Sequence, residues 1–260
     1  MPHLDVWLTA LGTSHRRLTG LVAGLSAEEL AGPSYASEWS IAQELAHIGS
    51  GAEIFGLFID AGLAGRPAPG ADEFQPVWQR WNAKSVTDQA GDALRTDAAL
   101  LARFDALDDE RRRDWTLSLF GTDQGLADLA RLRLGEHAVH TWDIAVTRNR
   151  RATVEPAAVE LLIDTLGQTA ALVAKPPGQP LRVSVTTQQP VRRLVLDARS
   201  AGLDLRGVDP STDALDGPTL QLPAEALIRL VYGRLDADHT PQLVADGVDL
   251  DVLRQIFPGF

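Results

Sequence analysis

Residues 135–143, Gly135-Glu-His-Ala-Val-His-Thr-Trp-Asp143, lie in a segment whose apolar pattern predicts a buried helix. Glu136 and His140 stand four residues apart, and on an α-helix this spacing brings two side chains to one face, one turn apart. Glu136 also falls on the apolar stripe of this helix, which consists of Leu129, Leu132, Val139 and Val146. Because an unpaired buried carboxylate is strongly disfavoured, the sequence predicts a cation or a hydrogen-bond network at this point.

Two neighbours of this pair are further candidates. His137 is adjacent to Glu136 but lies about 100° away around the helix, so we rank it below His140 as a ligand. Asp143 lies three residues after His140. Its carboxylate could hold the second imidazole nitrogen of His140 or serve as a fourth ligand, and orientation of the imidazole is the favoured role.

A third ligand candidate comes from an earlier helix. A capping-box pattern beginning at Ser40 predicts the start of this helix, and its apolar spacing continues to about Leu63. His47 lies beside the inner stripe, at the edge of the core. Because two helices of a four-helix bundle can bring three ligands to one interior point, His47, Glu136 and His140 form the predicted metal site. The competing interpretations are a partly buried histidine satisfied by a carbonyl and a plain surface ion pair.

The ligand types favour a catalytic zinc site. Two histidines and one carboxylate suit Zn²⁺ with an open coordination position, although Fe²⁺, Ni²⁺ and Mn²⁺ accept the same ligands. The chain has no cysteine, which excludes disulfides, thiolate ligands and a protein thiol nucleophile. A structural zinc would need a fourth protein ligand, and the sequence shows no convincing one.

Composition narrows the class of protein. The 260 residues, 45% of them hydrophobic, are enough for two domains. The net charge of −11 argues against binding to nucleic acid or to an anionic membrane surface. The N-terminal segment lacks the pattern of a signal peptide, and no apolar run reaches the roughly 18 residues of a membrane span. We therefore expect a cytoplasmic protein without a nucleic-acid or membrane partner, which could work as a monomer.

The pattern before residue 150 predicts a helical bundle. Four long helices are expected, with a break before residue 87 in the third, over residues 4–24, 40–63, 77–107 and 123–148. Ser26 begins a short additional helix. Residues 64–76 hold several glycines and prolines and predict a loop. The charge run 108–114 predicts a solvated turn, followed by a short extended piece over 115–120.

The pattern changes after residue 150, where we place the domain boundary. One more helix is expected over 157–173, and the apolar period then changes from 3.6 to 2, which predicts strands beginning at Leu181, Arg193, Leu203 and Leu220. Helices return over 223–232 and 250–256. The predicted fold is therefore α+β, with a metal-binding helical bundle over residues 1–150 and a smaller α/β sheet domain over residues 151–260.

The ligand segments resemble a known family. Trp39-Ser-Ile-Ala-Gln-Glu-Leu-Ala-His47, followed by Glu136-His-Ala-Val-His140-Thr-Trp-Asp143, is similar to the mycothiol-dependent maleylpyruvate isomerase family. The resemblance implies a DinB-like four-helix bundle in which a histidine on the second helix and a Glu-x-x-x-His on the last helix hold the metal. The C-terminal half resembles the family's smaller domain, similar to sterol carrier protein 2, through residues 220–234 and the C-terminal end.

This resemblance implies a low-molecular-weight thiol such as mycothiol as cosubstrate, activated at the metal as a thiolate. The thiolate would add to a small electrophilic substrate, either for isomerisation of a cis double bond or for thiol S-transfer. The resemblance also carries a catalytic role to Arg234, as a cation for an anionic substrate. A helix-terminal arginine complementing the helix dipole is about equally compatible with that position.

Other interpretations stay open at this stage. A zinc-bound water could support hydrolysis without a thiol, with Glu53 or Asp143 as the base. A non-enzymatic ligand-binding or stress-related protein with a vestigial metal site is a further alternative. The cluster Arg148, Arg150 and Arg151 could meet an acidic ligand, but a solvated linker is favoured. We expect the site at the mouth of the bundle, with residues 151–260 as a lid or substrate domain.

Overall fold

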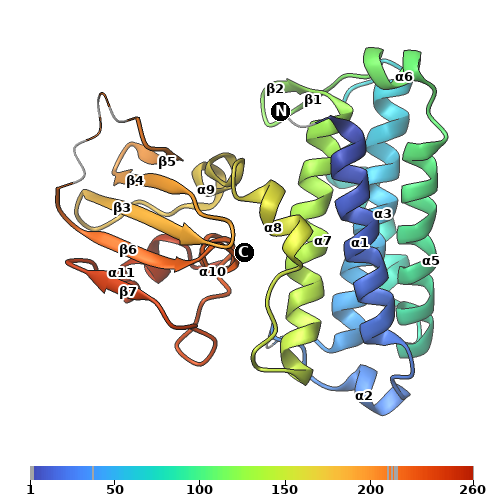
Figure 1. Cartoon of the computed structure of the whole chain (residues 1–260). Coiled ribbons are helices and arrows are strands. Elements are labelled where there is room, and N and C mark those ends of the chain that lie inside the picture. Colours follow the sequence, from blue (N-terminus) through green and yellow to red (C-terminus); the bar gives the residue numbers. More distant parts are fainter. Residues whose placement is uncertain (1–2, 37, 210, 212, 214–215, 260) are drawn as a thin grey trace. The chain divides into compact units, whose positions relative to one another are not determined.

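The computed structural model describes residues 3–36, 38–209, 211, 213 and 216–259. The chain divides into two compact units, Met1–Ala158 and Val159–Phe260. Of these four residues, Met1 and Phe260 lie outside the described ranges. The first unit is mainly helical and the second contains a five-stranded sheet, which confirms the predicted α+β class (Figure 1). Among the described residues, no helix combines the length and the apolarity that a bilayer crossing requires.

Four long helices build the first unit, as predicted, and Figure 1 shows how they run alongside one another. They are α1 (Leu4–Val22), α3 (Ile41–Leu63), α5 (Val86–Asp105) and α7 (Leu126–Arg148). Both α1 and α3 pack against α5 and α7, which closes the four helices around one core. Three shorter helices and a hairpin complete the unit: α2 (Ala27–Ala31), α4 (Ala71–Asn82), α6 (Asp109–Asp114), β1 (Leu117–Leu119) and β2 (Thr122–Gln124).

Helix α3 begins where the capping box predicts. The Ser40 side chain accepts from the Gln43 backbone N–H, and the Gln43 side chain accepts from the Ser40 backbone N–H. Close packing then fixes this helix against its neighbours, because a Cβ at Gly49 would overlap the Trp81 ring of α4 and the backbone of Ala93 on α5. The glycine therefore lets α3 approach both helices.

Two segments predicted as loop or turn are helical. The loop predicted over 64–76 is wrong in its second half, because α4 begins at Ala71, where the Glu73 side chain accepts from the Gly70 backbone N–H at 3.0 Å. The helix includes Pro76 in its second turn. The turn predicted over 108–114 is wrong for the same kind of reason: Asp108 accepts from the Arg111 backbone N–H at 2.8 Å and starts the solvent-facing α6.

The last long helix, α7, begins later than the predicted residue 123. Residues 122–124 form β2, which pairs antiparallel with β1, and α7 begins only at Leu126 after Gly125. The hairpin uses the extended segment that the alternation over 115–120 predicts. Glu136 and His140 lie in the middle of the α7 that remains, so this shift does not affect the predicted ligands.

The second unit contains one mixed sheet with the order β5-β4-β3-β6-β7 (Figure 1). Its strands are β3 (Leu181–Gln188), β4 (Arg193–Arg199), β5 (Gly202–Gly207), β6 (Thr219–Pro223) and β7 (Val244–Asp246). Only the β3–β6 pair is parallel among these ladders. The four predicted strands are confirmed, whereas β7 was missed because all three of its residues are exposed and show no alternation.

The helices of the second half agree with the prediction apart from one break. The single helix expected over 157–173 is two helices, α8 (Pro156–Leu162) and α9 (Leu166–Val173), separated by a turn in which Thr165 Oγ1 donates to the Leu162 carbonyl. Helix α10 (Ala224–Val231) packs on β3 and β6, and α9 packs on β5. Helix α11 (Leu250–Ile256) has the predicted bounds.

Candidate metal site

The structure brings the three predicted ligands together between α3 and α7. His47 Nε2 lies 3.7 Å from Glu136 Oε2, and His140 Nε2 lies 3.5 Å from the same oxygen. The ring centroids of the two histidines are 4.4 Å apart. One ligand atom from each of these side chains lies within 4.8 Å of the others, which is the range in which three side chains can share one ion.

These distances fit a shared cation better than direct hydrogen bonds. A hydrogen bond between nitrogen and oxygen is about 2.7–3.2 Å long. In contrast, tetrahedral zinc with ligands at about 2.0–2.2 Å places neighbouring ligand atoms roughly 3.3–3.6 Å apart. Two imidazoles and one carboxylate at this spacing therefore form a donor set that suits a divalent metal ion.

One side of this site is open. The side chains of His47 and Glu136 are 37% and 39% exposed, whereas that of His140 is 11% exposed. The half-buried Trp39 lies beside the two histidines, with ring centroids 5.2 Å from His47 and 6.5 Å from His140. A cation held here would keep a coordination position toward the exposed side, as catalytic zinc sites do.

Two buried carboxylates hold the other side of His140. Its Nδ1 lies 2.5 Å from Glu44 Oε1 and 3.2 Å from Asp143 Oδ2, and Ser34 Oγ donates to Glu44 Oε2 at 2.8 Å. Because Nδ1 is directed at these carboxylates, Nε2 is the ring nitrogen that faces Glu136. Such a carboxylate fixes the tautomer and the ring orientation of a metal-binding histidine. Asp143 therefore lies where its predicted orienting role requires.

Sequence reasoning missed Glu44. It is fully buried on α3, although it is an acidic residue, and it lies on the same helix face as Ile41 and Ile48. A buried carboxylate requires a partner. The position of Glu44 in the apolar stripe, three residues before His47, was the one signal that could have revealed its role.

Electrostatics of the side chains favour a cation at this point. Burial lowers the pKa of His47, which keeps its imidazole neutral. Burial also lowers the pKa of His140, but the neighbouring carboxylates of Asp143, Glu136 and Glu44 outweigh this effect and raise that pKa well above its ordinary value. Burial raises the pKa of Glu136, yet the two histidines beside it hold this pKa well below its ordinary value. Three carboxylate side chains thus lie around the His140 ring, an arrangement that a cation at this point would complement.

His137 is directed away from these ligands, toward a second cluster. It is fully buried, with Nδ1 2.8 Å from Ser14 Oγ and Nε2 2.9 Å from Asp97 Oδ2. His15 Nδ1 and Arg133 Nη2 each lie 2.7 Å from the same Asp97 carboxylate. The contacts of His15 and Arg133 with Asp97 are hydrogen bonds, whereas His137 Nε2 makes an ion-pair contact without hydrogen-bond geometry, and the arginine already neutralises the carboxylate. The second cluster is therefore a buried polar network rather than a metal site.

The remaining candidates lie elsewhere. Arg234 follows α10 in the second unit, is half-buried and donates from Nη1 to the Tyr232 carbonyl at 2.6 Å. Its role toward a substrate stays a prediction. Glu53 on α3 forms an ion pair with Arg80 and accepts from Trp81 Nε1 at 3.0 Å, so α4 engages this carboxylate.

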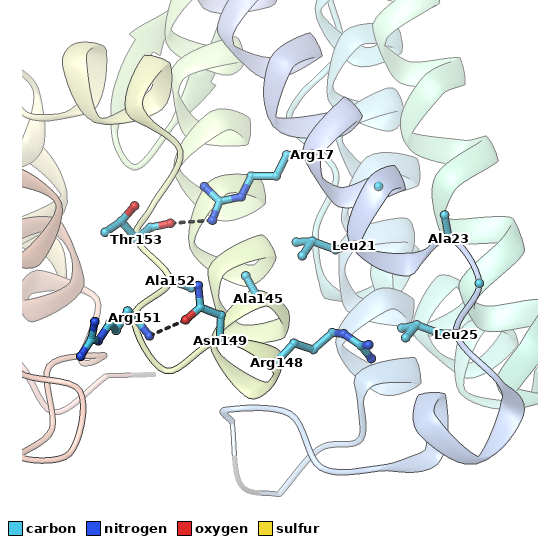
Figure 2. A pocket seen from close by; sticks show the side chains of 12 residues that line it. Arg17, Leu21, Ala23, Leu25, Ala145, Arg148, Asn149, Arg151, Ala152 and Thr153 are labelled. Carbon is cyan, nitrogen blue, oxygen red and sulfur yellow. Dashed lines mark hydrogen bonds between the residues drawn. The ribbon is translucent and has the colours of Figure 1, made fainter.

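Two members of the predicted arginine cluster, Arg148 and Arg151, border a groove of about 430 Å³ in the first unit, together with Arg17 (Figure 2). Arg17 donates to the Thr153 carbonyl at 2.7 Å, and Arg148 donates to Glu29 at 3.1 Å. Figure 2 shows the side chains of Arg17, Arg148 and Arg151 pointing in different directions. The guanidinium groups do not converge on one point, and Arg148 and Arg151 are exposed, as expected for a solvated linker.

The first unit matches a known family. The family model of the mycothiol maleylpyruvate isomerase N-terminal domain matches residues 11–145, which is more than half of the chain. The chain belongs to this family. The matched region of this mycothiol maleylpyruvate isomerase family member includes His47, Glu136 and His140, together with Glu44 and Asp143.

Solved structures share the fold of this family member. The crystal structure of the mycothiol-dependent maleylpyruvate isomerase is 12% identical to it with a TM-score of 0.69, and the similarity covers 95% of each chain. The crystal structure of a histidine-to-alanine mutant under the same name is 11% identical with a TM-score of 0.68, again over 95% of each chain. Comparison with curated protein sequences gives no match.

Proposed function

We propose that this protein is a metal-dependent enzyme that activates a low-molecular-weight thiol, mycothiol or a comparable one, as a thiolate nucleophile. The thiolate attacks a small electrophilic substrate, for isomerisation or for thiol S-transfer. The observation that carries the proposal is the spacing of 3.5–3.7 Å between the imidazole nitrogens of His47 and His140 and the Glu136 carboxylate, in a member of this family. This arrangement suits Zn²⁺ or another divalent metal.

In this proposal the chain's residues bind and orient, and the metal supplies the activation. His47, Glu136 and His140 are the ligands, and Glu44 and Asp143 retain the proton on Nδ1 of His140. A divalent metal ion stabilises a bound thiolate over the thiol, whose pKa is about 8.5 when free. Because the chain has no cysteine, the reactive sulfur would come from a cosubstrate.

The chemistry balances for both outcomes. In isomerisation, the thiolate sulfur adds to one carbon of a cis double bond activated by a neighbouring carbonyl, and the resulting single bond rotates. Elimination then releases the thiolate and leaves the trans product. In S-transfer, the carbon–sulfur bond persists. Arg234 is proposed to bind a substrate carboxylate. Residues 151–260 are proposed to act as the substrate domain and residues 1–150 as the metal-binding bundle.

Two observations favour this proposal over thiol-independent hydrolysis. Hydrolysis would need a base that faces the open side of the metal. Asp143 lies at Nδ1 of His140, away from the ligand atom Nε2, and Glu53 is engaged by Arg80 and Trp81. A vestigial site is disfavoured in turn, because the ligand atoms are at coordination spacing and their orienting carboxylate is buried in place.

The test combines metal analysis with turnover. We expect purified protein to hold about one divalent metal ion per chain and to convert maleylpyruvate, or to conjugate a chromogenic electrophile, only when mycothiol is added. His47→Ala should lose both the metal and the turnover. His239→Ala, a change at a histidine that pairs with Asp236 in the second unit, is the control and should retain both. Turnover that ignores the thiol would overturn the proposal.

A further inference from the structure

A buried arginine connects the two helices that carry the candidate ligands. Arg133 lies on α7, three residues before Glu136, and is 2% exposed. Its Nη2 donates to the Ile48 carbonyl of α3 at 2.9 Å and to Asp97 Oδ1 of α5 at 2.7 Å. Ile48 directly follows His47. The guanidinium therefore bonds to the backbone beside one ligand from the helix that carries the other two.

The facing helix leaves room for this guanidinium. Gly51 lies one turn after His47 on α3, and a Cβ at this position would come within 2.9 Å of Arg133 Nη1. The ring of Phe55, one turn further along α3, has its centroid 5.7 Å from the guanidinium carbon. A side chain larger than hydrogen at position 51 would force the arginine to shift.

Two histidines contact the carboxylate oxygen of Asp97 that does not accept from Arg133. This fully buried carboxylate has His15 Nδ1 of α1 at 2.7 Å and His137 Nε2 of α7 at 2.9 Å from Oδ2. His137 Nδ1 in turn lies 2.8 Å from Ser14 Oγ of α1. All four long helices thus contribute to a single network, and His137 holds α7 in a rotation that directs its neighbour Glu136 to the other side.

Stability alone explains this network poorly. A buried ion pair often adds no net stability over well-packed apolar side chains, because desolvation offsets the attraction between the charges. In addition, Arg133 Nε has no hydrogen-bond partner among the described residues, which is unfavourable for a buried donor. What the network does provide is a fixed orientation of the Arg133 guanidinium, whose hydrogen bond to the Ile48 carbonyl connects α7 to α3.

We infer that Arg133, held by Asp97 and bonded to the Ile48 carbonyl, is a brace between α7 and α3. This brace sets the separation of the two helices and so holds His47 Nε2 at the right distance from Glu136 and His140. This inference rests on the proposed metal site. Metal ligation tolerates errors of only about 0.2 Å in ligand distance. Without the brace, the two helices can relax by more than this tolerance, although every ligand is still present.

Zinc affinity is the first test. Competition with a chromophoric chelator measures the dissociation constant for zinc, and the visible spectrum of the cobalt form reports the coordination geometry. We expect Arg133→Met and Gly51→Ala to weaken zinc binding by about 10- to 100-fold, the usual range for residues that support ligands. Gly51→Ala retains every charged group, so it remains informative if Arg133→Met fails to fold.

The control is a matched hydrogen bond at the other end of α3. Trp115 Nε1 donates to the Ile59 carbonyl of α3 at 3.0 Å, and Trp115→Phe removes this bond without touching the brace. It should leave the zinc affinity within about twofold of the wild type. If all three variants bind zinc as the wild type does, or all three weaken it equally, the positioning role is overturned.

A metal-free readout separates this inference from the proposed function. Side-chain nitrogen NMR signals of His47 and His140 in the zinc-free protein report the tautomer and the hydrogen bonding of each ring, which change when the rings move relative to each other and to Glu136. These signals should move in Gly51→Ala and stay in place in Trp115→Phe. A wild type that binds no zinc would refute the proposed function, whereas unchanged signals in Gly51→Ala would refute the brace whether or not zinc binds.

Discussion

Replacement of Glu44 by glutamine tests how the site depends on the carboxylate behind His140. In Glu44→Gln, the amide oxygen can still accept the Nδ1 proton of His140, and the amide nitrogen can donate to Ser34 Oγ. The geometry of the 2.5 Å and 2.8 Å contacts is then retained, and only the negative charge is lost. The change isolates the contribution of charge, because Glu44 is fully buried and water does not replace it.

The expected loss of zinc affinity depends on which acceptors remain near Nδ1 of His140. Loss of a residue that supports a ligand typically costs 10- to 100-fold in metal affinity, or about 1.4–2.8 kcal/mol. Asp143 lies 3.2 Å from the same nitrogen and can still accept its proton, so Glu44→Gln should fall near the lower end, at about 10-fold. The double variant Glu44→Gln/Asp143→Asn should approach about 100-fold.

Zinc competition assays on the metal-free protein measure this effect. Glu53→Gln is the matched control, because Glu53 lies on the same helix but pairs with Arg80 of α4. It should bind zinc as the wild type does. If Glu44→Gln binds zinc within twofold of the wild type, then Glu44 does not support His140 as a ligand, and the reasoning from the buried carboxylate fails.

Three further predictions concern removal of the metal ion, the stability of the protein at acid pH, and the binding of a substrate carboxylate. Removal of the metal with a chelator should abolish thiol-dependent turnover and lower the melting temperature, and added zinc should restore both; a melting temperature that is the same with and without zinc would argue against specific binding. Burial raises the pKa of Asp97, but His137, Arg133 and His15 outweigh it and hold this pKa well below its ordinary value. The stability that Asp97 contributes is therefore present above pH about 3.9 and is lost as the pH falls through the lowered pKa. Asp97→Asn should lower the free energy of unfolding at pH 7 by about 3 kcal/mol and should flatten its decline below pH 4 in denaturant titrations, whereas an unchanged decline would assign the acid sensitivity to other groups. Arg234→Gln should reduce kcat/KM for a carboxylate substrate by about 10- to 100-fold without changing the metal content, whereas the exposed Arg199→Gln should not, and equal effects of both would refute a specific role.

Local sequence signals were enough for the main elements. The capping box at Ser40 predicts the start of α3, and the alternation after Leu181 predicts four of the five strands of the sheet. The Glu-x-x-x-His spacing in α7 predicts that Glu136 and His140 share a face, which depends only on helix geometry. Each of these features depends on residues that are close together in the chain, so it can be predicted from a single sequence.

The prediction fails in two situations. In the first, a helix cap stabilises a helix in a segment whose composition is typical of a loop. In the second, a residue's role depends on a partner that is distant in the sequence. The glycines and prolines before α4 suggested a loop, but Glu73 caps the helix and Pro76 is accommodated in it. The roles of Glu44 and Arg133 depend on which face of α3 meets α7. Their partners across these two helices, His140 and the Ile48 carbonyl, lie 96 and 85 residues away in the chain, and no local pattern encodes such pairings.

The central claim is that an external thiol becomes a ligand of a metal held by His47, Glu136 and His140. X-ray absorption at the zinc edge, recorded with and without mycothiol, tests it most directly. The account predicts a shell of nitrogen and oxygen at about 2.0–2.2 Å in the thiol-free protein and one additional sulfur at about 2.3 Å when the thiol is present. A spectrum that does not change on addition of the thiol would contradict the account.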